Sequence, residues 1–142
     1  MSASPVLSTR PEEHMLAAID LGSNSFHMLL GRVVEGQSVI TDRMKEMVQL
    51  GAGLDKDRML SEASQQRAIA CIERFGQRAS ALPGENVIAV GTNTLRVARN
   101  GERFLERAKR ALGHSIEIIS GVEEARLIHQ ARINRKSSQS MA

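Results

Sequence analysis

The stretch AAIDLGSNSFHMLL, residues 17–30, decides the fold of this chain. Two apolar runs flank a short turn that holds Asp20, Gly22 and the small polar residues Ser23, Asn24 and Ser25. Apolar runs of this length, separated by a cluster of Gly, Ser and Asn, are typical of two strands joined by a tight connection. The stretch therefore predicts a strand, a polar turn and a second strand.

The turn has the chemistry of a phosphate-binding loop. Gly22 lets backbone N–H groups approach a phosphate closely, and the side chains of Ser23, Asn24 and Ser25 add hydrogen-bond donors. Asp20, at the end of the first strand, can hold Mg2+ directly or through water. Because Gly, Ser and Asn also dominate ordinary β-turns, the residues alone leave a plain hairpin turn open as the alternative.

Residues 18–28, AIDLGSNSFHM, resemble the first phosphate-binding loop of the exopolyphosphatase / guanosine pentaphosphate phosphatase (Ppx/GppA) family. This family falls within the larger superfamily of actin, sugar kinases and heat-shock ATPases. The Asp-x-Gly core followed by Ser, Thr or Asn is shared by that whole superfamily, whereas the longer string is much more specific. The resemblance, which is closest to exopolyphosphatase, runs from about residue 15 to residue 130.

The composition is typical of a globular protein with one domain. The chain has 142 residues, of which 42% are hydrophobic and 25% charged. Aromatic residues make up only 2%, so the stacking platforms of single-stranded nucleic-acid binders are not available. The net charge of +3 is carried by Arg132, Arg135 and Lys136 near the end of the chain. The rest of the chain is neutral overall, and we expect no nucleic-acid partner.

The cysteine content and the hydropathy indicate a cytoplasmic protein. Cys71 is the only cysteine, so an internal disulfide is excluded, and its place in a predicted helix favours a core residue over a nucleophile. No stretch approaches the ~18 apolar residues of a membrane span, and the N-terminus lacks a signal-peptide pattern. We expect a chain that is not transmembrane, with peripheral membrane association left open.

The hydrophobic pattern predicts three strands and then alternating helices and strands. Helices are expected after N-caps at Ser61 and Asn100, the first ending before Pro83 and the second at Gly113, with a further helix after residue 119. We expect strands at residues 15–20, 26–34, 38–48, 87–90 and 116–119.

This order of elements predicts an α/β fold with a mixed sheet of about five strands. Alternating strands and helices require crossovers, so a parallel half should adjoin an antiparallel meander. The resemblance implies the ribonuclease-H-like fold of the actin, sugar-kinase and heat-shock ATPase superfamily. Residues 15–130 are expected to be an incomplete N-terminal phosphate-binding domain of the Ppx/GppA type, between a disordered lead-in at 1–14 and a basic tail at 131–142 that lies outside the family pattern.

A second polar segment, GTNTLR at residues 91–96, lies at a predicted junction from strand to helix. Backbone N–H groups and the positive end of a helix dipole favour an anion there, and the planar guanidinium of Arg96 can hold two phosphate oxygens. The alternative is a solvated surface arginine. The pattern is similar to a segment of the same family in which this arginine contacts substrate phosphate, and the two matches support each other.

A third segment, IISGVEEARLI at residues 118–128, leads into the last predicted helix. Ser120 and Glu123 have the spacing of a capping box, which gives Glu123 a structural role. Glu124 points about 100° away around the helix and is available for chemistry. In the family that the chain resembles, the second Glu of this pattern is taken as the catalytic residue, which agrees with the capping argument.

The resemblance implies Mg2+-assisted hydrolysis of a phosphoanhydride. In such a mechanism, residues 22–25 and Arg96 hold terminal phosphate oxygens, and Asp20 helps to place Mg2+. Glu124 orients and deprotonates the attacking water. The implied substrate is inorganic polyphosphate, cut from its end. The alternatives are the 5'-phosphate of guanosine pentaphosphate and a non-catalytic module that binds polyphosphate.

The family pattern stops near Gln130. A full-length relative would continue into a second, Gly-rich phosphate loop and a second domain that closes the cleft, and the resemblance implies that such relatives are homodimers. We therefore expect an N-terminal fragment whose sheet has an unpaired edge and which hydrolyses phosphoanhydrides weakly or not at all when alone.

Overall fold

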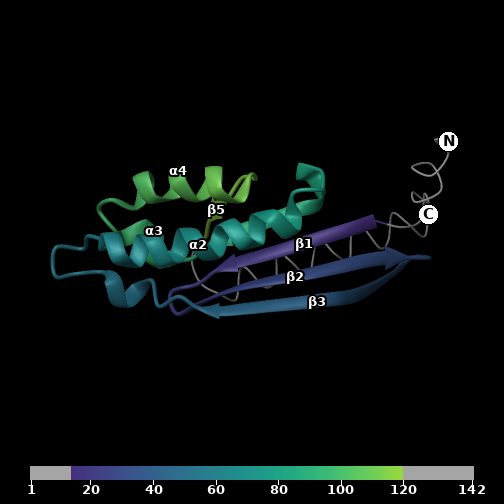
Figure 1. Cartoon of the computed structure of the whole chain (residues 1–142), viewed down its shortest axis with the longest axis horizontal. Helices are drawn as coiled ribbons and strands as arrows, with labels where there is room; N and C mark the ends of the chain where they lie inside the picture. The colour runs from purple at the N-terminus through teal and green to yellow at the C-terminus, as the bar shows by residue number, and fades with distance from the viewer. Residues whose placement is uncertain (1–13, 120–142) are drawn as a thin grey trace.

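The computed structural model describes residues 14–119. Its central element is a five-stranded mixed sheet. The strand order across the sheet is β3-β2-β1-β4-β5. Helices α2 and α4 both lie on one face of this sheet (Figure 1). The strands are β1 (His14–Leu21), β2 (Ser25–Val34), β3 (Gln37–Met47), β4 (Val87–Gly91) and β5 (Glu117–Ile118). The longer helices are α2 (Glu62–Ala79) and α4 (Gly101–Leu112), and single turns lie at η1 (Gly51–Gly53), η2 (Gly84–Asn86) and α3 (Asn93–Val97).

Strands β1, β2 and β3 form the predicted antiparallel meander. Glu35 and Gly36, which join β2 to β3, have φ values of 51° and 80°. Positive φ at both central residues is what a tight two-residue hairpin turn requires. Along β3, half-buried residues alternate with exposed ones from Thr41 to Met47, so one face of this strand is open to solvent.

The other half of the sheet is parallel, as the alternation of strands and helices predicted. Strand β1 pairs in parallel with β4, and β4 pairs in parallel with β5. Helix α2 lies on the connection into β4, and α4 lies on the connection into β5. The predicted α/β mixed sheet of five strands is therefore confirmed, although β5 is only two residues long.

The main core lies between the sheet and these helices. Helix α2 begins after Ser61, whose Oγ accepts a hydrogen bond from the Ser64 N–H at 3.1 Å, as its predicted N-cap role requires. Its buried face includes Phe75, and α4 contributes Phe104. Both phenylalanines are fully buried. The predicted core role of Cys71 is confirmed, since this side chain is fully buried as well.

Asn100 departs from its predicted role. It occupies the N-cap position of α4, but its side chain makes no capping hydrogen bond. The amide instead contacts the backbone of Leu60, which lies 40 residues earlier in the chain. Strand β1 also begins one residue inside the predicted lead-in, at His14. The predicted last helix and the predicted basic tail lie outside the described residues.

Candidate functional site

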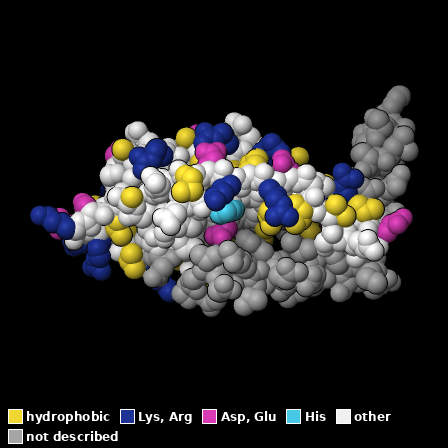
Figure 2. Space-filling model, turned by 90° about the horizontal axis from the view of Figure 1, so that it is seen from below, with side chains coloured by type: hydrophobic (Ala, Val, Ile, Leu, Met, Phe, Trp, Pro, Cys, Tyr) yellow, Lys and Arg dark blue, Asp and Glu magenta, His cyan; other side chains and the backbone are white. Residues whose placement is uncertain are grey.

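Asp20 lies near the end of β1, on the face of the sheet away from the helices. Its neighbours Ile19 and Leu21 are fully buried in the main core, so the alternation of a strand turns Asp20 to the opposite face. Across the sheet, Asp20 is paired with His27 of β2, and His27 is paired with Lys45 of β3. In the view of Figure 2, a histidine side chain lies beside an acidic side chain and close to basic ones.

The predicted phosphate loop is a tight turn between β1 and β2. The Gly22 N–H donates to the Ser25 carbonyl oxygen at 3.1 Å, and a Cβ on Gly22 would lie only 2.9 Å from that same oxygen. Glycine is therefore required for this approach. The side chain of Asn24 is exposed, while Ser23 and Ser25 are half-buried. The Ser25 hydroxyl contacts His27 Nε2 at 3.0 Å.

The second predicted segment lies directly against this turn. The Thr92 N–H donates to the Leu21 carbonyl oxygen at 3.2 Å, which fixes the end of β4 to the end of β1. The hydroxyl oxygens of Ser23 and Thr94 lie 2.5 Å apart. The two polar segments, separated by 71 residues at this contact, are thus brought together at one end of the sheet.

Arg96 lies on α3, a helix of five residues, and falls in the last turn of that helix. Because α3 ends at Ala98 and is little more than one turn long, its first and last turns overlap at Arg96. A helix this short has a small dipole, so the attraction for an anion would come from the guanidinium itself. The Arg96 side chain is exposed and makes no ion pair with another described residue.

A third segment, residues 49–53, supports the turn and was not predicted as part of the site. The Gly51 N–H donates to the Ser23 carbonyl oxygen at 2.9 Å, and the Gln49 N–H donates to the Asn24 carbonyl oxygen at 2.7 Å. Gln49 has a φ of 55°, a conformation that non-glycine residues seldom adopt outside sites that the surrounding structure fixes. The signal in the sequence that points to this segment is the pair Gly51 and Gly53.

Glu124 lies outside the described residues, as do Ser120 and Glu123 of the predicted capping box. The described chain ends beside the site, however. The Ile119 N–H donates to the Gly91 carbonyl oxygen at 2.9 Å, so the chain reaches residue 119 next to the start of the second polar segment. The role of Glu124 remains a prediction.

Asp20, the carboxylate beside the turn, suits a magnesium ion better than a zinc ion. Among residues 14–119, no three His, Cys, Asp or Glu side chains are clustered as a metal site. Mg2+ is commonly held by one or two carboxylates together with waters and substrate phosphates. Asp20, whose Oδ1 atom is buried beside the turn, is a suitable single carboxylate for that arrangement. The assignment of Asp20 and of Mg2+ stays a prediction.

Three ionisable groups between α2 and β3, which are Cys71, Arg74 and Glu46, have structural roles. Burial, together with the nearby Glu46 carboxylate, raises the pKa of the Cys71 thiol to about 12. A thiol with so high a pKa is protonated near neutral pH and is a poor nucleophile. Glu46 accepts a hydrogen bond from Arg74 Nε at 2.8 Å, and this bond lowers the pKa of the Glu46 carboxyl. No helix among the described residues is long and apolar enough to cross a membrane.

The comparisons with known proteins agree with this architecture. Residues 29–140 match the model of the Ppx/GppA phosphatase family. The chain is 49% identical over 116 residues to the guanosine-5'-triphosphate,3'-diphosphate pyrophosphatase of Aliivibrio fischeri, and 48% identical over 116 residues to that of Aeromonas hydrophila. Each alignment covers 82% of this chain but only 23% of the relative, so the chain spans about a quarter of the length of these curated relatives.

Solved structures show the same relation. The crystal structure of the Aquifex aeolicus Ppx/GppA family member is similar with a TM-score of 0.74 and 27% identity, over 84% of this chain and 39% of that one. An exopolyphosphatase from Cytophaga hutchinsonii is similar with a TM-score of 0.71 and 29% identity, over 80% of this chain and 36% of that one. The predicted fold relation is therefore confirmed, and the chain belongs to the Ppx/GppA phosphatase family.

Proposed function

We propose that this chain provides the first phosphate-binding part of a hydrolase that removes the 5'-terminal phosphate of guanosine pentaphosphate. The name carried by relatives with 48–49% identity favours this substrate over inorganic polyphosphate. The observation that carries the proposal is the contact between Ser23 and Thr94, which joins the two polar segments at one end of the sheet. A terminal phosphate placed there could be bound from two segments at once.

The residues have distinct roles in this proposal. Gly22 keeps the turn tight, and backbone N–H groups and hydroxyls of residues 23–25 bind phosphate oxygens. Arg96, exposed and without an ion pair to a described residue, binds the outer oxygens. Asp20 would hold Mg2+, which would neutralise charge on the phosphates. Glu124 would orient the attacking water and accept its proton. Because the alignments cover 23% of the relatives, we expect hydrolysis to need further parts of such an enzyme.

Inorganic polyphosphate is the second candidate substrate, because a structural neighbour with a TM-score of 0.71 is named an exopolyphosphatase. Calorimetric titration of the 142-residue chain with guanosine pentaphosphate and with linear tripolyphosphate, each with Mg2+, separates the two candidates. We expect tighter binding of the nucleotide. Preference for tripolyphosphate would favour the second candidate, and binding of neither would refute both.

Two variants test the assigned roles. Arg96→Gln should weaken binding of both ligands by about tenfold or more, since a charge-assisted contact to phosphate is lost. Arg103→Gln is the matched control, because Arg103 is another exposed arginine but lies on α4. Glu124→Gln should retain binding and abolish whatever phosphate release the chain shows. Binding that persists with no release from either the unaltered chain or Glu124→Gln would favour a non-catalytic phosphate-binding module.

A further inference from the structure

We propose that Asn100 is a positioning residue for the phosphate site. Its side chain anchors the far end of the loop formed by residues 49–60, while the near end of the same loop holds the backbone of the turn at residues 22–25. The inference deepens the proposed function and rests on it. It concerns a residue that touches no phosphate itself and would act through the loop.

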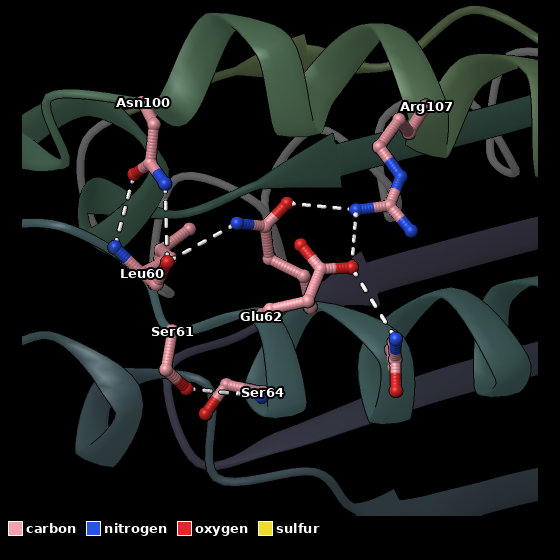
Figure 3. A network of polar contacts seen from close by, with 8 residues as sticks. Leu60, Ser61, Glu62, Ser64, Asn100 and Arg107 are labelled. Atoms are coloured by element: carbon pink, nitrogen blue, oxygen red, sulfur yellow. Dashed lines mark hydrogen bonds and ion pairs between the residues drawn. The ribbon is translucent and has the colours of Figure 1, made fainter.

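The Asn100 amide binds both backbone groups of Leu60. Its Oδ1 accepts from the Leu60 N–H at 2.9 Å, and its Nδ2 donates to the Leu60 carbonyl oxygen at 3.1 Å (Figure 3). An asparagine at an N-cap normally accepts a hydrogen bond from its own helix. Asn100 gives up that role for a segment 40 residues away, which indicates that the position of Leu60 is specified by this side chain.

Further bonds fix the same end of the loop. The Gln65 side chain, 7% exposed, donates from Nε2 to the Leu60 carbonyl oxygen at 3.1 Å. The Arg99 N–H donates to the Arg58 carbonyl oxygen at 2.7 Å. Residues 58–60 are thus held against the segment that follows α3, the helix that carries Arg96. At this end the loop is therefore anchored to Arg99 and Asn100, a few residues after the second polar segment.

The loop connects its anchored end at Leu60 to the turn at residues 22–25. It folds back on itself, since the Ser61 N–H donates to the Gly53 carbonyl oxygen at 3.0 Å and Leu54 pairs with Leu60 in an isolated bridge. Gly53 belongs to the single turn η1, whose first residue, Gly51, donates to Ser23. A closed ring of contacts therefore runs from Asn100 through the loop to Ser23, across to Thr94, and back along α3.

A merely structural role for Asn100, as one more contact between α2 and α4, makes a different prediction. Arg107 serves that purpose in the same interface, where its Nη1 donates to Gln65 Oε1 at 3.0 Å and lies 3.4 Å from a carboxylate oxygen of Glu62 (Figure 3). Loss of Arg107 should weaken the helix contact and remove one partner of Gln65, but it leaves both Asn100 bonds to Leu60 in place, so the loop should be released less than by loss of Asn100. Arg107→Gln is therefore the matched control for Asn100.

The test is amide hydrogen exchange of the 142-residue chain, followed by NMR, together with titration of linear tripolyphosphate. Asn100→Ser keeps a preferred N-cap residue but removes both bonds to Leu60, and Asn100→Asp keeps only the acceptor. In Asn100→Ser we expect the Gly51 and Gln49 amides to exchange about tenfold faster or more, because their end of the loop is released. We also expect tripolyphosphate to bind about threefold or more weakly.

Asn100→Asp should show smaller changes of the same kind, and Arg107→Gln should change amide exchange and tripolyphosphate binding the least, because both Asn100 bonds remain. Unchanged exchange at Gly51 and Gln49 in a folded Asn100→Ser or Asn100→Asp chain would overturn the inference, as would an equal acceleration in Arg107→Gln. If the unaltered chain binds neither tripolyphosphate nor guanosine pentaphosphate, the proposed function fails. The claim that Asn100 affects phosphate binding then fails as well. The exchange data would then still show whether Asn100 controls the loop.

Discussion

The helix-covered face of the sheet and the loop end of the sheet are held together by different kinds of contact. On the helix face, α2 and α4 bury large side chains such as Phe75 and Phe104 against the strands. At the loop end, main-chain bonds such as Gly51 to Ser23 and Thr92 to Leu21 join segments that are far apart in the sequence. The first region depends on side-chain volume, and the second depends on backbone geometry. Mutations should therefore separate stability from ligand binding.

The largest effect on stability is expected from Phe75→Ala. Phe75 is fully buried within the main core, and truncation of such a side chain costs about 3–5 kcal/mol of unfolding free energy. Urea unfolding followed by circular dichroism measures this loss, with Phe75→Leu as the milder control. The fraction of the variant that stays folded should bind tripolyphosphate as the unaltered chain does. A loss below about 1 kcal/mol would show that this face does not depend on side-chain volume.

Gly22→Ala should reduce ligand affinity more than it reduces stability. The added Cβ would lie 2.9 Å from the Ser25 carbonyl oxygen, so the turn must change shape. We expect tripolyphosphate affinity to fall by about tenfold or more, equivalent to about 1.4 kcal/mol, with a smaller change in unfolding free energy. Gly84→Ala is the control, because a Cβ at Gly84 meets nothing within 4 Å. Equal binding by the two variants would remove the turn from the site.

The difference between the helix-covered face and the loop end also explains which features could be predicted from the sequence. The strands of the meander and helix α2 follow from hydrophobic period and from the cap at Ser61, which are local signals. The turn at residues 22–25 follows from its composition and from the family string. The loop of residues 49–60 was missed, because its hydrogen bonds to Ser23 and Asn24 depend on which strands become neighbours. The N-cap position of Asn100 was predicted, but its side-chain partner was missed for the same reason, since Leu60 is adjacent only in the folded chain.

An intermediate effect is expected on the unfolding free energy, which should depend on pH through the Cys71 thiol of α2. Burial raises the pKa of Cys71 from its ordinary value of 9.0 to about 12, so the unfolded chain releases this proton at lower pH than the folded chain does. Stability must therefore fall as pH rises above 9.0, by at most about 1.4 kcal/mol per pH unit. We expect about 1.4 kcal/mol of this loss between pH 8 and pH 10.

The contribution of Cys71 is isolated by comparison with Cys71→Ala, which removes the titrating group. The unaltered chain should lose more stability than the variant between these pH values, although the variant starts from a lower stability because of the cavity it creates. Parallel pH profiles for the two proteins would mean that the thiol is not desolvated in the folded chain.

The smallest effect is expected from Arg74→Gln, which removes the ion pair between α2 and β3. The hydrogen bond from Arg74 lowers the pKa of Glu46, so the pair stabilises the fold above the unfolded pKa of this carboxyl. That contribution is lost as pH falls through the lower, folded pKa. Because the Arg74 side chain is 54% exposed, solvent screens the pair and we expect about 0.5 kcal/mol or less at neutral pH. Urea unfolding at low and high salt measures this, with Arg103→Gln as the exposed control. A loss as large as that of Phe75→Ala would mean that charge, and not side-chain volume, fastens this helix to the sheet, and the contrast between the two regions would fail.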